Sequence, residues 1–380
     1  MMPSPAAHLQ PGFATSEGTM SYSQRFVDRA ATGHFREGLG APGLKMSSLG
    51  IGTYLGEPDE ATDLAYTEAV VAAVAGGINV IDTAINYRFQ RSERAVGAAL
   101  RRLAAAGYGR EEVILCTKAG FLTPDGDMPA DAEKYFRQQF LDTGVFGAED
   151  VAAGCHCMAP AYLENQLERS RQNLGAACVD VFYLHNPETQ LAEVDRGEFR
   201  NRVRKAFQFL ESAVKAGRIR AYGLATWNGF RQDAKERDYL SLPEMAGLAR
   251  DAGGDTHHFR FVQLPYNLAM PEALTRPNQT LEGRAVPVVQ VARALGITLI
   301  SSAALLQGQL ATNLPPFVAE ALGLSSDRLR ALQFARSSPG ITTALVGMSR
   351  AEHVRANIAL AGVPPASREQ FLKLFEGRGQ

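Results

Sequence analysis

The sequence has no excess of charge of either sign and no long hydrophobic run. Its 39 lysine and arginine residues balance 40 aspartate and glutamate residues in a chain of 380, so the net charge does not favour nucleic acid or an anionic membrane as a partner. No apolar run could span a bilayer, and the first twenty or so residues lack the apolar stretch of a signal peptide. We therefore expect a cytoplasmic protein.

Cysteine is scarce, with four residues, and tryptophan occurs once. Cys116 and Cys178 lie in apolar contexts that are typical of reduced thiols in a core. Cys155, His156 and Cys157 form one short cluster, but it lacks the second ligand pair that zinc sites contain. The sequence therefore predicts reduced thiols and no metal site.

A nucleotide-binding pattern occurs in an unsuitable context. Residues 38–43, GLGAPG, match the glycine spacing of a dinucleotide-binding loop. That loop requires a strand before it and a helix after it, whereas no strand pattern precedes Gly38 and Pro42 with Gly43 would open a helix poorly. We therefore expect no Rossmann fold here.

The chain alternates short apolar runs with helical patterns. The runs that are typical of buried strands lie near residues 47–53, 78–82, 113–117, 179–184, 219–224, 260–264, 297–301 and 343–346. Helical crossovers between them fit a (β/α)8 barrel, an α/β fold, although a doubly wound sheet has the same alternation. One helix is clearly delimited, since Pro160 suits its first turn and Gly175 its end.

The composition, 46% hydrophobic, shows no break that would divide the chain into two folding units. We expect residues 1–44, rich in Ser, Pro, Gly and Ala, to form an N-terminal extension and residues 45–380 to form the barrel. Residues 122–158 exceed the usual strand-to-helix connection of about two to six residues, so we expect an insertion. Its aromatic residues favour either a substrate lid or a surface element with a local apolar cluster: Tyr135, Phe136, Phe140 and Phe146.

An acid and a tyrosine follow the second predicted strand. Asp82 would end the strand that begins at Ile78, and Tyr87 would lie on the loop before a helix that Ser92 can cap. This helix has an apolar stripe formed by Ala95, Val96, Ala99 and Leu100. An acid at a strand end serves equally well as a helix cap or a loop acceptor, so the pair needs partners elsewhere.

Two further polar residues occupy matching places. Lys118 follows the run Val113–Thr117, and an unpaired ammonium there would cost several kcal/mol to bury, so it requires an acid such as Asp82. His185 follows the run Val179–Leu184. All these side chains would meet at the carboxyl ends of the strands.

The motifs around these residues resemble those of the aldo-keto reductase family. The resemblance rests on IDTAINY, the following SERAVGAAL, a strand that ends in TK, and VDVFYLHNP. It continues through GRIRAYGLATW, FVQLPYNL, GITLISSAALLQGQL and VGMSRAEHVRANI, and covers roughly residues 45–360. Asp82, Tyr87, Lys118 and His185 match the catalytic tetrad of the family. Since these residues lie at the carboxyl ends of the strands, they favour the barrel over the doubly wound sheet.

The resemblance implies an oxidoreductase that transfers a hydride between a nicotinamide cofactor and a carbonyl or alcohol. Reduction leaves an alkoxide that needs a proton, and Tyr87 would deliver it as general acid. Lys118 would lower the pKa of the tyrosine, Asp82 would hold Lys118 charged, and His185 would orient the carbonyl oxygen.

The family pattern also assigns cofactor contacts. It places Gly52, Thr53 and Tyr54 in the cofactor cleft, Thr226 and Gln263 at the nicotinamide amide, and Leu305, Gly308 and Leu310 at the pyrophosphate. The adenosine end would contact Gly347, Ser349, His353 and Asn357, on a helix that Ser349 and Glu352 open as a capping box, where free amides favour a phosphate.

Departures from the pattern leave the cofactor type open. Ala225-Thr226 stands in place of Ser-Asn, and Ser302 in place of an aromatic residue that stacks on the nicotinamide. Gly347 and His353 replace cations that bind the 2′-phosphate in several members, which leaves Arg350 as a substitute. NADP(H) is favoured and NAD(H) remains possible.

Two other functions fit the same residues. One is a redox-sensing regulatory subunit that resembles the potassium-channel β subunits. The other is a TIM-barrel isomerase or lyase in which Lys118 forms a Schiff base with a carbonyl. We disfavour it because a lysine paired with an aspartate and a tyrosine is a poor nucleophile. The sequence predicts neither the substrate, the direction of the reaction nor the oligomeric state.

Overall fold

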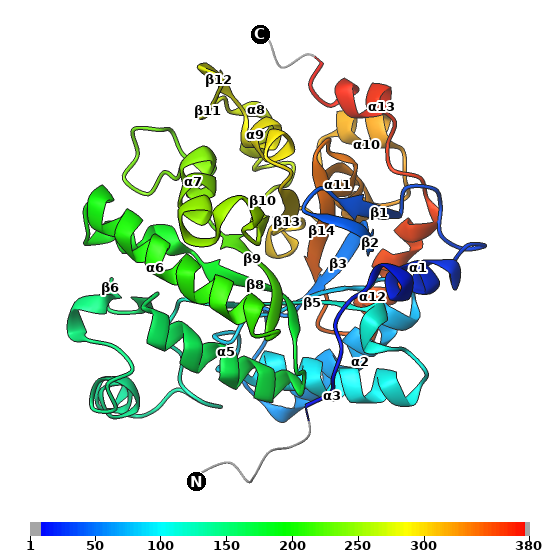
Figure 1. Cartoon of the computed structure of the whole chain (residues 1–380). Coiled ribbons are helices and arrows are strands. Elements are labelled where there is room, and N and C mark those ends of the chain that lie inside the picture. The colour runs from blue at the N-terminus through cyan, green and yellow to red at the C-terminus, as the bar shows by residue number, and fades with distance from the viewer. Residues whose placement is uncertain (1–8, 377–380) are drawn as a thin grey trace.

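The computed structural model describes residues 9–376, and its central element is a closed barrel of parallel strands (Figure 1). The strands follow one another around the barrel in chain order, and the last pairs with the first. They are β3 (Leu49–Gly52), β4 (Val80–Asp82), β5 (Ile114–Ala119), β8 (Val179–His185), β9 (Ile219–Ala225), β10 (Phe259–Pro265), β13 (Thr298–Ser302) and β14 (Ile341–Gly347). Each overlaps a predicted run, so the (β/α)8 barrel is confirmed.

Helices surround the strands, as Figure 1 shows. The longer ones are α2 (Glu60–Ala75), α3 (Arg91–Ala105), α5 (Pro160–Leu174), α6 (Arg196–Lys215), α7 (Leu242–Gly253), α9 (Val288–Ala294), α11 (Asp327–Ser337) and α12 (Ala351–Ile358). Their apolar faces pack on the barrel and bury, for example, Val96 and Leu100 of α3. Helix α5 begins at Pro160, and Gly175 ends it with φ +63°, a conformation that glycine adopts without strain.

The residues before β3 close the amino-terminal end of the barrel. They form α1 (Ser16–Gln24) and an antiparallel hairpin of β1 (Phe35–Gly38) and β2 (Ala41–Ser47). Ala14, Ala41 and Met46 pack into a buried cluster with first residues of barrel strands, such as Val80 and Ile114. A strand therefore does lead up to Gly38, contrary to the expectation, but a second strand and not a helix follows, so the GLGAPG pattern spans the hairpin turn at Leu39–Gly40. The boundary at residue 44 stays a prediction.

The segment between β5 and α5 has its own small core. It contains α4 (Ala132–Phe136), the π-helical turn η2 (Arg137–Leu141), the 3-10 turn η3 (Ala148–Asp150) and a short hairpin of β6 (Val151–Ala152) and β7 (His156–Cys157). Phe140 and Phe146 are buried against Tyr162 of α5. These rings therefore have a packing role, and a role of the segment as a substrate lid stays a prediction.

Shorter elements complete the fold: 3-10 turns η1 (Arg110–Glu112), η4 (Pro187–Ala192), η5 (Gly254–Thr256), η6 (Leu306–Gly308) and η7 (Ala359–Gly362), helices α8 (Glu272–Thr275), α10 (Pro316–Leu322) and α13 (Arg368–Lys373), and the hairpin β11 (Gln279–Leu281) and β12 (Arg284–Val286). All four cysteines are free thiols. None of the helices within residues 9–376 combines the length and hydrophobicity that crossing a bilayer requires.

Two predicted helix caps are wrong. Helix α3 begins after Gln90, and the Ser92 hydroxyl donates to the Thr53 carbonyl oxygen (2.8 Å) instead of capping the helix. Helix α12 begins after Arg350, which makes no side-chain cap, so Ser349 and Glu352 form no capping box. Both helices therefore begin without the side-chain cap that the local sequence pattern predicts.

Candidate active site

A cleft of about 880 Å³ opens at the carboxyl ends of the barrel strands. Residues at or just beyond the end of every barrel strand line it, among them Gly52, Asp82, Phe121, His185, Ala225, Gln263, Ser302 and Gly347. In (β/α)8 enzymes this face holds the chemistry, because the loops that follow the strands converge there.

A buried lysine lies between an acid and a tyrosine that line the cleft. Lys118 Nζ lies 2.6 Å from Asp82 Oδ2 and 3.1 Å from the Tyr87 hydroxyl, and it also donates to the Thr83 carbonyl oxygen at 2.9 Å. Gln263 Nε2 donates to the other Asp82 oxygen at 2.7 Å. Strand ends β4 and β5 thus bring together the acid and the lysine that the sequence predicted to pair, and Tyr87 lies on the loop between β4 and α3.

These contacts set the protonation states. Burial alone would lower the pKa of Lys118, but the charges of Asp82 and Tyr87 and their hydrogen bonds raise it above its ordinary value. Burial raises the pKa of Tyr87, and the Lys118 charge opposes this without reversing it. The Lys118 charge thus lowers the pKa of Tyr87, as the sequence predicted, but burial outweighs it, so Tyr87 is a protonated phenol beside an ammonium.

His185 completes the group from the end of β8. Its ring lies 5.7 Å from the Tyr87 ring, centroid to centroid, and its Nδ1 lies 3.1 Å from Asn86 Oδ1. Burial and the nearby Lys118 charge lower the pKa of His185 well below its ordinary value, so the ring is neutral. Asn86 precedes Tyr87 and touches the histidine, so its side-chain amide determines which ring nitrogen carries the proton.

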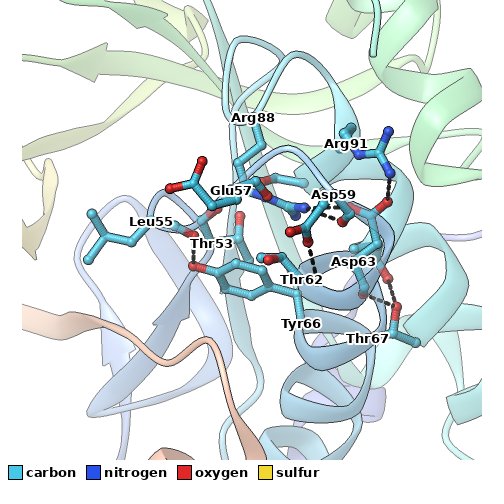
Figure 2. Close-up of polar contacts among 12 residues, drawn as sticks. Thr53, Leu55, Glu57, Asp59, Thr62, Asp63, Tyr66, Thr67, Arg88 and Arg91 are labelled. Carbon is cyan, nitrogen blue, oxygen red and sulfur yellow. Dashed lines mark hydrogen bonds and ion pairs between the residues drawn. The ribbon is translucent and has the colours of Figure 1, made fainter. Parts of the chain in front are cut away.

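The loop after Tyr87 has an unusual backbone. Arg88, Phe89 and Gln90 have φ values of +49°, +56° and +73°, in the left-handed region that non-glycine residues rarely adopt. Figure 2 shows the Arg88 guanidinium between the β3–α2 loop and α2. It donates to the carbonyl oxygens of Glu57 (2.8 Å) and Asp59 (3.1 Å).

A carboxylate and a ring complete the Arg88 contacts (Figure 2). Arg88 pairs with Asp63 of α2 at 2.6 Å, and Asp63 also binds Arg91 at 2.7 Å. The guanidinium carbon lies 5.5 Å from the centroid of the Tyr66 ring, whose hydroxyl donates to the Leu55 carbonyl oxygen. Arg88 therefore ties the turn that carries Tyr87 to the loop that carries Tyr54 and Leu55, both of which line the cleft.

Most residues that the sequence assigned to a cofactor line this cleft: Gly52, Thr53, Tyr54, Thr226, Gln263, Ser302, Leu305, Gly308, Gly347, Ser349, His353 and Asn357. Leu310 and Arg350 are not among the lining residues. Arg350 is exposed just before α12 and next to Ser349, which lines the cleft, so its role as a substitute phosphate ligand stays a prediction.

Sequence reasoning missed several lining residues. Asn86 and Phe121 adjoin predicted site residues, and Phe121 packs edge-on against His185 with a 5.1 Å centroid separation. Proximity in sequence to Tyr87 and Lys118 could have indicated both. Arg328 also lines the cleft from α11, and no motif pointed to it.

The Cys155–Cys157 cluster serves packing. His156 Nε2 lies 2.7 Å from the His185 carbonyl oxygen, and its Nδ1 lies 2.8 Å from Gln190 Nε2. Within residues 9–376, no group of three or more histidine, cysteine or acidic side chains is arranged to hold a metal ion. His156 thus supports the backbone of the histidine at the cleft.

The sequence of this chain matches a family model across the whole barrel. Residues 48–375 match the aldo/keto reductase family. The chain belongs to this family. The sequence motifs predicted the membership, and the arrangement of strands and of Asp82, Tyr87, Lys118 and His185 agrees with it.

Two curated relatives resemble this chain at low identity. A putative voltage-gated potassium channel subunit beta of Schizosaccharomyces pombe is 24% identical over 87% of this chain and 90% of its own length. The NADH-specific methylglyoxal reductase of Escherichia coli is 27% identical, but the match covers 54% of this chain and 55% of that protein.

A solved structure shows the same fold. An aldo/keto reductase from Klebsiella pneumoniae, in complex with NADP and acetate, has a TM-score of 0.60 and 20% identity, and the match covers 90% of this chain and 94% of that one. At this identity the likeness concerns the fold alone.

Proposed function

We propose that this chain is an oxidoreductase that interconverts a carbonyl compound and the corresponding alcohol with NADP(H), with Tyr87 as the general acid. The observation that carries the proposal is the position of Lys118 Nζ, which lies 2.6 Å from Asp82 and 3.1 Å from the Tyr87 hydroxyl, two residues that line the cleft. A lysine held charged in this way stabilises a phenolate after the tyrosine gives up its proton.

The walls of the cleft fit a polar cofactor. Thr226 Oγ1 and Asn357 Oδ1 are buried and have no hydrogen-bond partner among the described residues. Buried polar atoms are seldom left unpaired, and both residues line the cleft. A nicotinamide dinucleotide would give them partners: Thr226 and Gln263 would hold its amide, Leu305 and Gly308 its pyrophosphate, and Ser349, His353 and Asn357 its adenosine part.

When bound, the reduced cofactor supplies a hydride to the carbonyl carbon. The residues of this chain do the rest. His185, neutral and fixed by Asn86, orients the carbonyl oxygen beside Tyr87. The tyrosine O–H transfers its proton to that oxygen as negative charge develops there, so carbon gains the hydride and oxygen gains the proton. Lys118 balances the phenolate until water restores its proton, and oxidation of an alcohol runs through the same groups in reverse.

The relatives bear on the choice of cofactor. The Klebsiella structure contains NADP, which favours NADP(H) here, and the Escherichia coli relative is named as specific for NADH, which keeps NAD(H) open. One assay addresses both: loss of NADPH or NADH absorbance with 4-nitrobenzaldehyde as a generic substrate. Turnover with NADPH supports the proposal, and no turnover with either cofactor over a range of carbonyl compounds contradicts it.

A second candidate function has one specific observation behind it. The relative from Schizosaccharomyces pombe is named as a channel subunit, and the match covers 90% of its length. A cofactor-binding regulatory subunit would bind NADPH in the same cleft. Tight NADPH binding without aldehyde-dependent turnover would favour this function over the enzyme.

A further inference from the structure

Among the described residues that line the cleft, Arg328, the second residue of α11, is the one lysine or arginine, because the buried Lys118 is not part of the lining. Asp82 is the acidic residue in the same lining, and Lys118 already neutralises it. Arg328 therefore contributes a positive charge that no acid in the lining balances.

Arg328 also lacks partners outside the lining. No described residue forms an ion pair or a side-chain hydrogen bond with it, and its Nε is buried without an acceptor. The adjacent acid is already committed, since Asp327 Oδ1 binds Arg330 at 2.6 Å and Oδ2 accepts the Leu314 amide at 3.0 Å. A partly buried guanidinium without an acceptor loses hydration that it does not recover within the chain, so an anionic ligand would complete it.

The topology places this charge far from the reacting end of the cleft. Helix α11 connects β13 to β14, and β13 lies opposite β5, the strand of Lys118, in the ring of eight strands. The same lining includes Gln307, Gly308 and Ala311 from the loop after β13 and His353 from α12, elements that come before and after α11 in the chain. A ligand that reaches from Tyr87 across the barrel would end beside this arginine.

We propose that Arg328 binds a phosphate group of the dinucleotide. The inference rests on the proposed function, and it moves the phosphate contact from the residues after β14, where the sequence offered only Arg350, to α11. Arginine suits the task because its planar fork matches two phosphate oxygens at once. The 2′-phosphate and the pyrophosphate share this chemistry. NADH has the pyrophosphate but lacks the 2′-phosphate, so the affinity for NADH distinguishes the two contacts.

The experiment is a titration of the fluorescence of the single tryptophan, Trp227, which lines the cleft. NADPH and NADH are titrated into the wild type and into R328Q, R328K, R350Q and R355Q. R355Q is the matched control, because Arg355 is an exposed arginine of α12 whose pair with Glu352 lies at the surface. Circular dichroism shows whether each variant keeps its fold.

We expect R328Q to weaken NADPH binding about tenfold or more, the loss of one charge-assisted phosphate contact, with partial recovery in R328K. An effect on NADPH alone identifies the 2′-phosphate, and an equal effect on NADH identifies the pyrophosphate. If the affinities of R328Q for NADPH and NADH are unchanged, or if only R350Q loses affinity, the inference about Arg328 is overturned. Binding of NADPH by the wild type would still support the proposed function. Wild-type protein that binds neither dinucleotide would contradict both.

Discussion

The left-handed turn after Tyr87 allows a sharp test of the local structure. Replacing Arg88 by alanine removes the hydrogen bonds to the carbonyl oxygens of Glu57 and Asp59 and the pair with Asp63. Hydrogen bonds from charged donors contribute about 1.5–3 kcal/mol each. Glu57 and Asp59 lie on an exposed loop, so their carbonyls regain water, and Asp63 keeps Arg91. We therefore expect R88A to lose about 2 kcal/mol of unfolding free energy.

Glycine at the same position should behave differently from alanine. The φ of Arg88 is +49°, which glycine adopts freely and alanine does not. Since both variants lose the same contacts, R88G should be more stable than R88A by about 1 kcal/mol. Arg102 is the matched control, an exposed residue in the last turn of α3, where helix propensity makes R102G less stable than R102A by up to about 1 kcal/mol.

The assay is equilibrium unfolding in urea, followed by circular dichroism and by Trp227 fluorescence. The account predicts opposite signs for the glycine-minus-alanine difference at Arg88 and Arg102. The same sign at both positions would refute the left-handed turn, and an R88A variant as stable as the wild type would refute the energetic role of the Arg88 contacts.

Two further predictions concern histidines. Asn86→Asp places a carboxylate against His185, which raises the pKa of the ring, so loss of reductase activity on acidification should begin at higher pH than in the wild type; superimposable pH profiles of kcat/KM would contradict this. Burial lowers the pKa of His34 and of His156 to about 4. Because the unfolded chain takes up these protons first, stability should fall as pH drops from about 6.5 to 4, by about 1.4 kcal/mol per pH unit for each histidine. Urea unfolding at several pH values should show this dependence of the unfolding free energy on pH. In His34→Gln the slope should be smaller by the contribution of one proton, and an unaltered slope would be evidence against a buried neutral His34.

The barrel and the Lys118 site were predictable because their signals are local. Each strand is a short apolar run. A lysine at the end of such a run requires an acid, so the sequence alone predicted the pairing of Lys118 with Asp82. The direction of the Tyr87 pKa was not predictable in the same way, because it depends on how far burial outweighs the Lys118 charge.

The remaining features depend on tertiary contacts that leave no local signature. Arg88, Phe89 and Gln90 are not residues that favour a left-handed backbone, and the contacts of Arg88 to a distant loop hold them there. Arg328 lies in a helix whose sequence shows no ligand motif, and only the closure of the barrel brings it to the cleft. Strand β1, which ends at Gly38, likewise has no apolar run that would have indicated it.

The most direct test of the account compares Tyr87→Phe with the wild type in the reduction of 4-nitrobenzaldehyde by NADPH. The substitution removes one hydroxyl, while Lys118 keeps its contacts with Asp82 and Thr83. The account predicts that kcat falls about 100- to 10,000-fold, as expected for loss of a general acid, while the NADPH affinity reported by Trp227 is unchanged. If Tyr87→Phe binds NADPH normally and its kcat equals that of the wild type, the assignment of Tyr87 as the proton donor is contradicted.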